Sequence, residues 1–307
     1  IGDDLAPYKI TREITTIVKR CIREAGVPYE NVLGVGLGMA GIVDSARGIC
    51  LYSPMLNWQQ VELGPALRFE LHLPVRIDND VNTLAVAERQ FGEGRDYANF
   101  LLFAIGIGIG AGIVIHGEIY HGSHGGAGEF GHMVIDPSAD APICHCGKRG
   151  CLEAIVSDYA LIRAATGQTD DAEIRENSSR IVADLAEQAR RGDTRLQKIF
   201  SYAGRMLGIA IANLINTLDP DCVFLEELAG GDQLFQPMFE TIPQHTFGPS
   251  QKSTIRIIKP ASQIAWARGA ASLILREVFQ PPIYENQDMV VLDHLLTPVS
   301  QQRHRRK

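Results

Sequence analysis

The chain has 307 residues, of which 45% are hydrophobic and 21% charged, and this ordinary globular composition excludes a mainly disordered protein. The length predicts about two domains. Basic residues number 29 and acidic residues 36, giving a net charge of −7, so we do not expect these residues to bind nucleic acid themselves. The longest apolar run, Phe100–Ile115, contains four glycines and is shorter than the ~20 residues that cross a bilayer, so no membrane association is expected.

The first residue and the cysteines bear on cellular context. The chain begins with Ile1, so we expect it to start inside a longer polypeptide, and no signal peptide is identified. Three cysteines fall within residues 144–151, whereas the other three, Cys21, Cys50 and Cys222, are single. A secreted disulfide scaffold spaces its cysteines for pairing, while one tight cluster indicates a metal site in a reducing compartment. We therefore expect a cytoplasmic protein.

Hydrophobic periodicity predicts alternating helices and strands along the chain. In the first part we expect a helix over 10–25, strands at 32–37, 47–53 and 75–78, and a helix over 79–91 that stops at Gly92 and Gly94. In the second part we expect strands at 99–104 and 112–115 joined by glycines, a third at 118–120, helical structure over 177–218, strands at 221–225 and 255–258, and a helix over 264–279. This order predicts an α/β protein with two lobes.

The strongest local pattern is a cysteine cluster, Cys144-x-Cys146-Gly-x-x-Gly-Cys151. Three thiolates on a glycine-containing turn can converge on one ion, and zinc takes four ligands tetrahedrally. We predict His132 as the fourth ligand, because the ring of His145, between two cysteines, is expected to point away. Four protein ligands make the zinc structural. The alternative is a set of reduced thiols that holds no metal.

A run of alternating glycines follows the strand at 99–104, with Gly106, Gly108 and Gly110 as its first members. A dinucleotide-binding fingerprint requires a helix after such a loop, and here a strand follows, which excludes that interpretation. The backbone amides of the loop could face a phosphate. A tight turn that only requires small residues explains the pattern equally well.

Five polar residues have the chemistry of a sugar pocket: Asn79, Asp80, Glu129, His132 and Glu153. Carboxylates accept hydrogen bonds from hydroxyls, and an amide both donates and accepts. A metal would fix His132 through one ring nitrogen and leave the other for a ligand. In the simpler alternatives, Asp80 is a helix N-cap, and the glutamates are surface acids on a metal-binding loop.

Taken in order, these segments resemble the ROK family of repressors and sugar kinases, from about residue 32 to 279. The most specific motif is His132 followed by the cysteine cluster and Glu153. The others are Gly38-Met39-Ala40-Gly41-Ile42-Val43-Asp44, Asp78-Asn79-Asp80-Val81-Asn82, the glycine hairpin and Gly125-Gly126-Ala127-Gly128-Glu129-Phe130-Gly131-His132.

The resemblance implies a two-lobed actin-like, sugar-kinase (ribonuclease H-like) fold, with the N-terminal strands of the small lobe absent from this chain. Residues 1–92 would form the incomplete small lobe, with 264–280 packing back on it. Residues 93–263 would form the large lobe with its zinc loop at 121–153, and 281–307 a C-terminal tail.

The resemblance also implies roles for individual residues. Asn79, Asp80, Glu129, His132 and Glu153 match the sugar-binding positions, and Asp80 matches the general base of the kinases. Zinc would be held by His132 and the three clustered cysteines, Cys144, Cys146 and Cys151.

This sequence departs from the kinases of the family in the segments that bind the nucleotide in those kinases. No Asp-x-Gly-Gly-Thr loop is present, Ile107 replaces a threonine of the glycine hairpin, and Glu226-Glu227-Leu228 stands where kinases place glycines. These losses favour the sugar-sensing body of a ROK-type transcriptional regulator that binds a monosaccharide without phosphorylating it. Such a regulator would contact DNA only through an upstream module and would form a homodimer or homotetramer. The alternative is a sugar kinase that uses ATP and Mg²⁺.

Overall fold

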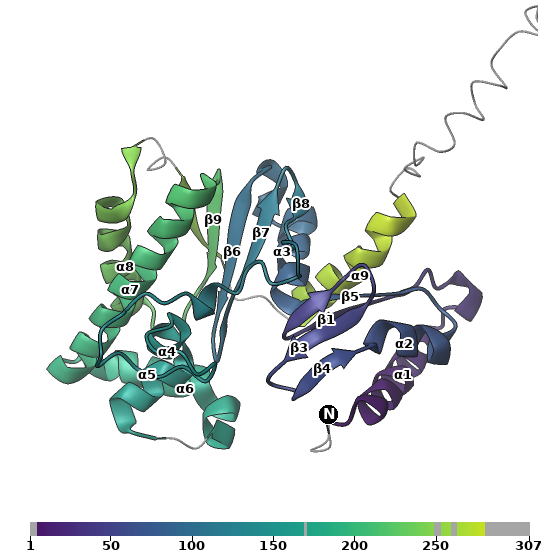
Figure 1. Ribbon diagram of the computed structural model, residues 1–307, viewed down its shortest axis with the longest axis horizontal. Helices are drawn as coiled ribbons and strands as arrows, with labels where there is room; N and C mark the ends of the chain where they lie inside the picture. The colour runs from purple at the N-terminus through teal and green to yellow at the C-terminus, as the bar shows by residue number, and fades with distance from the viewer. Residues whose placement is uncertain (1–4, 169–170, 249–252, 259–262, 280–307) are drawn as a thin grey trace, which may run out of the picture. The chain divides into compact units, whose positions relative to one another are not determined.

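The computed structural model describes residues 5–168, 171–248, 253–258 and 263–279 (Figure 1). The tail expected at 281–307 lies outside the described residues. Within the described part, no helix combines the length and the apolar character that a membrane span requires.

In the first part of the chain, two helices and two small sheets share one hydrophobic core. Helix α1 begins with Pro7, whose missing N–H is not needed in the first turn. One face of α1 packs with Trp58, Leu67 and Ile77 through the buried Ile10. The elements are α1 (Pro7–Glu24), the parallel pair β1 (Val35–Met39) and β5 (Val75–Asn79), the antiparallel β2 (Ile42–Asp44), β3 (Ile49–Ser53) and β4 (Trp58–Val61), and α2 (Leu63–Leu71).

A five-stranded mixed sheet organises the second part, with strand order β10-β9-β6-β7-β8. Strand β6 pairs antiparallel with β7 and parallel with β9, which in turn pairs parallel with β10. The predicted hairpin and the two later strands are therefore confirmed. The bounds are β6 (Phe100–Ile105), β7 (Ile109–Ile115), β8 (Glu118–Ile119), β9 (Cys222–Glu226) and β10 (Thr254–Ile258).

Helices cover both faces of this sheet. Successive side chains of β6 point to opposite faces, and because all of them are apolar, each face must be shielded from water. Leu101 and Phe103 join a core with helix α7, whereas Phe100 and Leu102 join a separate core with helix α3. Figure 1 shows α7 and α8 side by side along the sheet. The helices are α3 (Asp80–Phe91), α4 (Glu153–Val156), α5 (Asp158–Thr166), α6 (Asp171–Arg190), α7 (Thr194–Leu218), α8 (Asp232–His245) and α9 (Gln263–Phe279).

The helical structure expected over 177–218 is two helices. Helix α6 ends at Arg190, Gly192 adopts a positive φ of 111°, and Asp193 caps α7 by accepting from the N–H groups of Arg195 and Leu196. This Gly-Asp break is an ordinary helix stop followed by a helix start, which the apolar periodicity concealed.

Helix α8 was not predicted because it contains Pro237 and Pro243, residues that normally terminate helices. Helix α8 nevertheless forms and packs closely against α7, with Pro237 at the contact. A Cβ at Gly204 of α7 would lie 2.4 Å from the carbonyl oxygen of Leu234, so the two helices approach each other closely through glycine.

Candidate functional site

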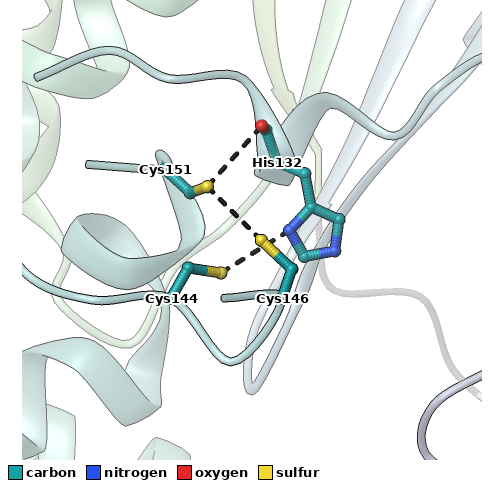
Figure 2. Close-up of side chains that lie close together, drawn as sticks. All are labelled: His132, Cys144, Cys146 and Cys151. Atoms are coloured by element: carbon teal, nitrogen blue, oxygen red, sulfur yellow. Dashed lines mark hydrogen bonds between the residues drawn. The ribbon is translucent and has the colours of Figure 1, made fainter. Parts of the chain in front are cut away.

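The cysteine cluster converges as the sequence predicted. The Sγ of Cys144 lies 3.6 Å from Nδ1 of His132, and the Sγ atoms of Cys146 and Cys151 are 3.7 Å apart. Figure 2 shows the three sulfur atoms and the ring nitrogen directed toward one another. One potential ligand atom from each residue lies within 4.8 Å of the others, so the four residues can hold a metal ion.

Two glycines explain why this loop can turn so tightly. Gly147 and Gly150 both have positive φ, 87° and 73°, in the region that residues with a side chain rarely adopt. A Cβ at Gly150 would also lie 1.7 Å from the carbonyl oxygen of Asp136. The N–H of Cys144 donates to the carbonyl of Lys148 and closes the turn at 2.8 Å. The spacing of the cysteines therefore depends on both glycines.

His132 connects the cysteine cluster to the carboxylates beside it. Its Nδ1 faces Cys144, and its Nε2 lies 3.9 Å from a carboxylate oxygen of Glu129. Burial raises the pKa of Cys144 to about 12, so a metal that binds there must displace a proton. A bound metal would thus fix the ring that faces Glu129.

Three carboxylates come from separate parts of the chain. Partial desolvation raises the pKa of Glu129, whose side chain remains 40% exposed; His132 opposes this rise, and the negative charges of Glu153 and Asp80 add to it. Burial also raises the pKa of Asp80. Asp80 begins α3, Glu129 precedes the short 3₁₀ helix Phe130–His132, and Glu153 begins α4. The structure therefore places Glu129 and Glu153 beside His132, and the charge of Asp80 is felt by Glu129.

Asn79, not Asp80, is the N-cap of α3, so the alternative interpretation of Asp80 is wrong. The side-chain oxygen of Asn79 accepts from the N–H groups of Val81 and Asn82 at 2.9 and 3.2 Å. Its amide nitrogen donates to the carbonyl of Gly41 at 3.1 Å. One oxygen of Asp80 accepts from the N–H of Val81 at 2.9 Å. The carboxylate of Asp80 thus keeps further acceptor capacity for a ligand.

Glu153 lies beside His132 and also accepts a hydrogen bond from the glycine hairpin. Its Oε2 accepts from the N–H of Ile109 at 2.9 Å, and its Oε1 lies 3.0 Å from Nδ1 of His145. The same Nδ1 of His145 lies 4.0 Å from Sγ of Cys144, so the expectation that this ring points away from the cysteines is wrong, although the four-residue group itself contains His132 and not His145. A carboxylate offers about four acceptor positions, so these contacts leave room for a ligand hydroxyl.

The glycine hairpin combines packing with one open position. A Cβ at Gly110 would lie 2.7 Å from Val81 of α3, and a Cβ at Gly108 would lie 3.2 Å from the carboxylate of Glu153. Nothing lies within 4 Å of the corresponding Cβ at Gly106. Close packing therefore accounts for Gly110 and Gly108, and Ile107 at the tip of the turn is 37% exposed.

The segment after β9 leads from two glutamates into helix α8. Glu226 ends β9 and is buried, and the N–H of Glu227 donates to the carbonyl of Ile258. Two overlooked glycines, Gly230 and Gly231, come directly before α8. A groove of about 740 Å³ follows this segment, lined by Glu227, Asp232, Phe235, Gln236, Phe239, Glu240 and Ile257. Its three carboxylates are unfavourable for a polyphosphate.

Comparison with known sequences assigns the chain to a family. The sequence model described as the ROK family matches residues 5–277. A putative xylose repressor from Caldicellulosiruptor sp. strain Rt8B.4 is 33% identical over 286 residues, which cover 90% of this chain and 71% of the repressor. A glucokinase from Halalkalibacterium halodurans is 35% identical over 217 residues, covering 68% and 66% of the two chains.

Solved structures include the same two kinds of protein. A ROK hexokinase from Thermus thermophilus superposes with a TM-score of 0.73 at 27% identity, covering 88% of this chain and 87% of the hexokinase. A ROK family transcriptional regulator described as a homologue of the E. coli MLC protein gives a TM-score of 0.71 at 29% identity, covering 86% and 67%.

Proposed function

The chain belongs to the ROK family, and from this premise we propose that it is the sugar-sensing body of a ROK-type transcriptional regulator. It has the α/β fold of the ROK sugar kinases. In this proposal it binds a monosaccharide without phosphorylating it, is cytoplasmic, and contacts DNA only through an upstream module. The xylose repressors among its relatives make xylose the first sugar to test.

The observation that carries the proposal is the placement of two carboxylates at His132: an oxygen of Glu129 lies 3.9 Å from its Nε2, and an oxygen of Glu153 lies within 4.8 Å of a ring nitrogen. The negative charge of Asp80 also acts on Glu129. Carboxylates bind sugar hydroxyls as hydrogen-bond acceptors, and imidazole can donate or accept. Asn79 completes the proposed set, because its cap fixes the backbone from which Asp80 projects.

We assign the metal of the cysteine cluster to zinc, because three thiolates and one imidazole form a zinc-type donor set. With all four positions supplied by protein, zinc would stabilise the loop and take no part in a reaction. His132 would then present its second nitrogen beside Glu129 in a fixed orientation.

Two features support the proposed absence of phosphorylation: the residue at the tip of the glycine hairpin and the charge of the groove beside α8. Ile107 at the tip of the glycine hairpin cannot donate a side-chain hydrogen bond to a phosphate. The groove beside Glu227, Asp232 and Glu240 carries negative charge that repels phosphates. Positioning and charge neutralisation supply most of phosphoryl transfer, and a general base alone contributes only ~10²–10⁴-fold.

We also propose that residues 1–92, with 264–280, form the small lobe and residues 93–263 the large lobe, in a homodimer or homotetramer. Symmetric self-association suits a regulator, because a two-fold protein matches a palindromic site.

Calorimetry on the full-length protein, with its metal bound, tests the sugar-binding function. The panel comprises xylose, glucose, N-acetylglucosamine, N-acetylmannosamine and fructose. We expect one sugar to bind and the Glu129→Gln variant to bind it about tenfold or more weakly, as loss of a hydrogen bond to a charged group predicts. No binding across the panel by folded, metal-loaded protein would reject the sensor.

The second candidate is an ATP-dependent sugar kinase with Asp80 as general base and Mg²⁺ as cofactor. It is favoured by the raised pKa of the half-buried Asp80 and by Gly230 and Gly231 before α8. A coupled phosphorylation assay with the same sugars separates the two functions. Ordinary turnover that is lost in Asp80→Asn would establish the kinase and reject the regulator proposal.

A further inference from the structure

A histidine outside the predicted site contacts the segment that carries Asn79 and Asp80. Nε2 of His121 lies 2.7 Å from Oδ2 of Asp78, whose side chain is almost completely buried. The other oxygen of Asp78 accepts from the backbone N–H of Asn79 at 2.7 Å and from the side chain of Asn82 at 3.0 Å. Both oxygens of this buried carboxylate are thus paired, as burial requires.

His121 also begins the segment that leads to Glu129 and His132. It follows strand β8, which lies beside α3 (Figure 1), and its carbonyl accepts from the N–H of Ala127 at 3.2 Å. The turn that this bond closes reaches β2, because a Cβ at Gly125 would lie 2.4 Å from the carbonyl oxygen of Val43. One residue therefore contacts both sequence segments that supply the candidate site.

The chemistry of the His121–Asp78 contact makes it stronger than an ordinary hydrogen bond. The carboxylate of Asp78 raises the pKa of His121 through their hydrogen bond, although burial opposes the rise. An imidazolium that donates to a carboxylate forms a charge-assisted bond, about twice as strong as a neutral one. Asp78 is the next-to-last residue of β5 and pairs with Gly38 of the parallel strand β1.

We propose that His121 is a positioning residue, which holds the segment of Glu129 and His132 in place relative to Asn79 and Asp80. This inference rests on the proposed sugar-binding function, but it predicts an effect on the protein without sugar as well. His121 acts through Asp78 and does not touch the ligand. Its loss should therefore loosen the segment 122–132 and weaken sugar binding together.

Three substitutions at His121 distinguish positioning from other roles. Glutamine places an amide donor near the position of Nε2, whereas asparagine is too short and alanine has no donor. Hydrogen exchange of residues 122–132 is measured without sugar, and calorimetry measures affinity for the sugar that the wild type binds. His124→Ala is the matched control, because His124 is exposed in the same segment.

We expect His121→Ala and His121→Asn to exchange faster at 122–132 and to bind sugar about tenfold or more weakly. His121→Gln and His124→Ala should stay near wild type in both measurements. Unchanged exchange and affinity in His121→Ala and His121→Asn would overturn the proposal. So would a glutamine variant that binds as weakly as alanine while exchanging like wild type, because His121 would then contact the sugar directly.

A wild-type protein that binds no sugar in the panel would reject the proposed function, and the exchange measurement would still decide the role of His121. If His121→Ala does not fold, His121→Asn against His121→Gln gives the same comparison. Faster exchange in asparagine but not in glutamine supports positioning, and equal exchange in both contradicts it.

Discussion

Two adjacent residues, Asn79 at the end of β5 and Asp80 at the start of α3, have different roles. Asn79 satisfies two N–H groups of the first turn of α3 and holds the carbonyl of Gly41. Asp80 is the first residue of the helix, where a negative charge is favoured by the helix dipole although burial raises the pKa of the carboxyl. Because Asn79 supplies the cap, the carboxylate of Asp80 is not needed for capping.

Replacing Asn79 with alanine should lower the free energy of unfolding by about 1–2 kcal/mol, because the cap of α3 is lost. Urea unfolding measures this change. Asn79→Ser is the matched control, since serine keeps a neutral capping oxygen and lacks the amide donor to Gly41. Equal destabilisation by both substitutions would mean that the bond to Gly41, and not the cap, carries the stability.

The raised pKa of Asp80 predicts a pH-dependent effect of Asp80→Asn. A carboxyl whose pKa is higher in the folded than in the unfolded state makes the protein lose stability as pH rises from about 3.8 through the folded value. The asparagine variant lacks this loss. Its stability relative to wild type should therefore increase with pH across that window and then level off. Unfolding curves between about pH 3 and 7 that stay parallel would contradict the assignment.

At the scale of elements, the glycine hairpin is shaped by the helix that packs on it. Gly110 and Gly112 of β7 face Val81 and Ala85 of α3, where an added Cβ would lie 2.7 and 2.6 Å from side-chain atoms. The close approach of α3 to β7 therefore requires glycine at two of the alternating positions. Gly106, at the open end of the turn, is not constrained in this way.

This difference predicts that two alanine substitutions in one hairpin have different effects on the free energy of unfolding. Gly110→Ala should cost about 1–3 kcal/mol, as overpacking of a tight contact does. Gly106→Ala is its control and should be nearly neutral, since nothing lies within 4 Å and its φ is not in the left-handed region. Thermal unfolding of the two variants compares them directly. A destabilised Gly106→Ala with an unaffected Gly110→Ala would refute the packing explanation.

At the scale of the whole molecule, a metal and a ligand pocket would share one side chain. His132 faces Cys144 with one ring nitrogen and Glu129 with the other. The carboxylate of Glu153 joins the loop of His145 to the N–H of Ile109 in the hairpin. Loss of the metal should therefore disturb the pocket as well as the loop.

We expect about one zinc per chain, and its removal by a chelator should lower the melting temperature and the sugar affinity together. Cys146→Ser should reproduce both effects by removing a ligand. Cys21→Ser is the control, because Cys21 is exposed and outside the cluster. Elemental analysis, thermal melts and calorimetry on the same samples test the coupling. Full zinc content in Cys146→Ser would contradict the ligand assignment.

The sequence alone determined those features whose residues lie close together in the chain. The cysteine cluster with Gly147 and Gly150, the strand-to-helix junction at Asn79, and the β6–β7 hairpin all follow from local spacing and backbone preference. The alternation of helices and strands and the family motifs also follow from residues that are close together in the sequence. Local rules also explain the errors, since proline normally excludes a helix such as α8 and periodicity concealed the break at Gly192.

Only the tertiary structure decided which distant groups meet. The bond of Glu153 to Ile109 joins residues 44 positions apart, and that of His121 to Asp78 joins residues 43 apart. No local preference encodes such contacts, because they depend on how helices and strands pack. The same packing half-buries Asp80 and raises its pKa, whereas the sequence could show only that a carboxylate follows a strand.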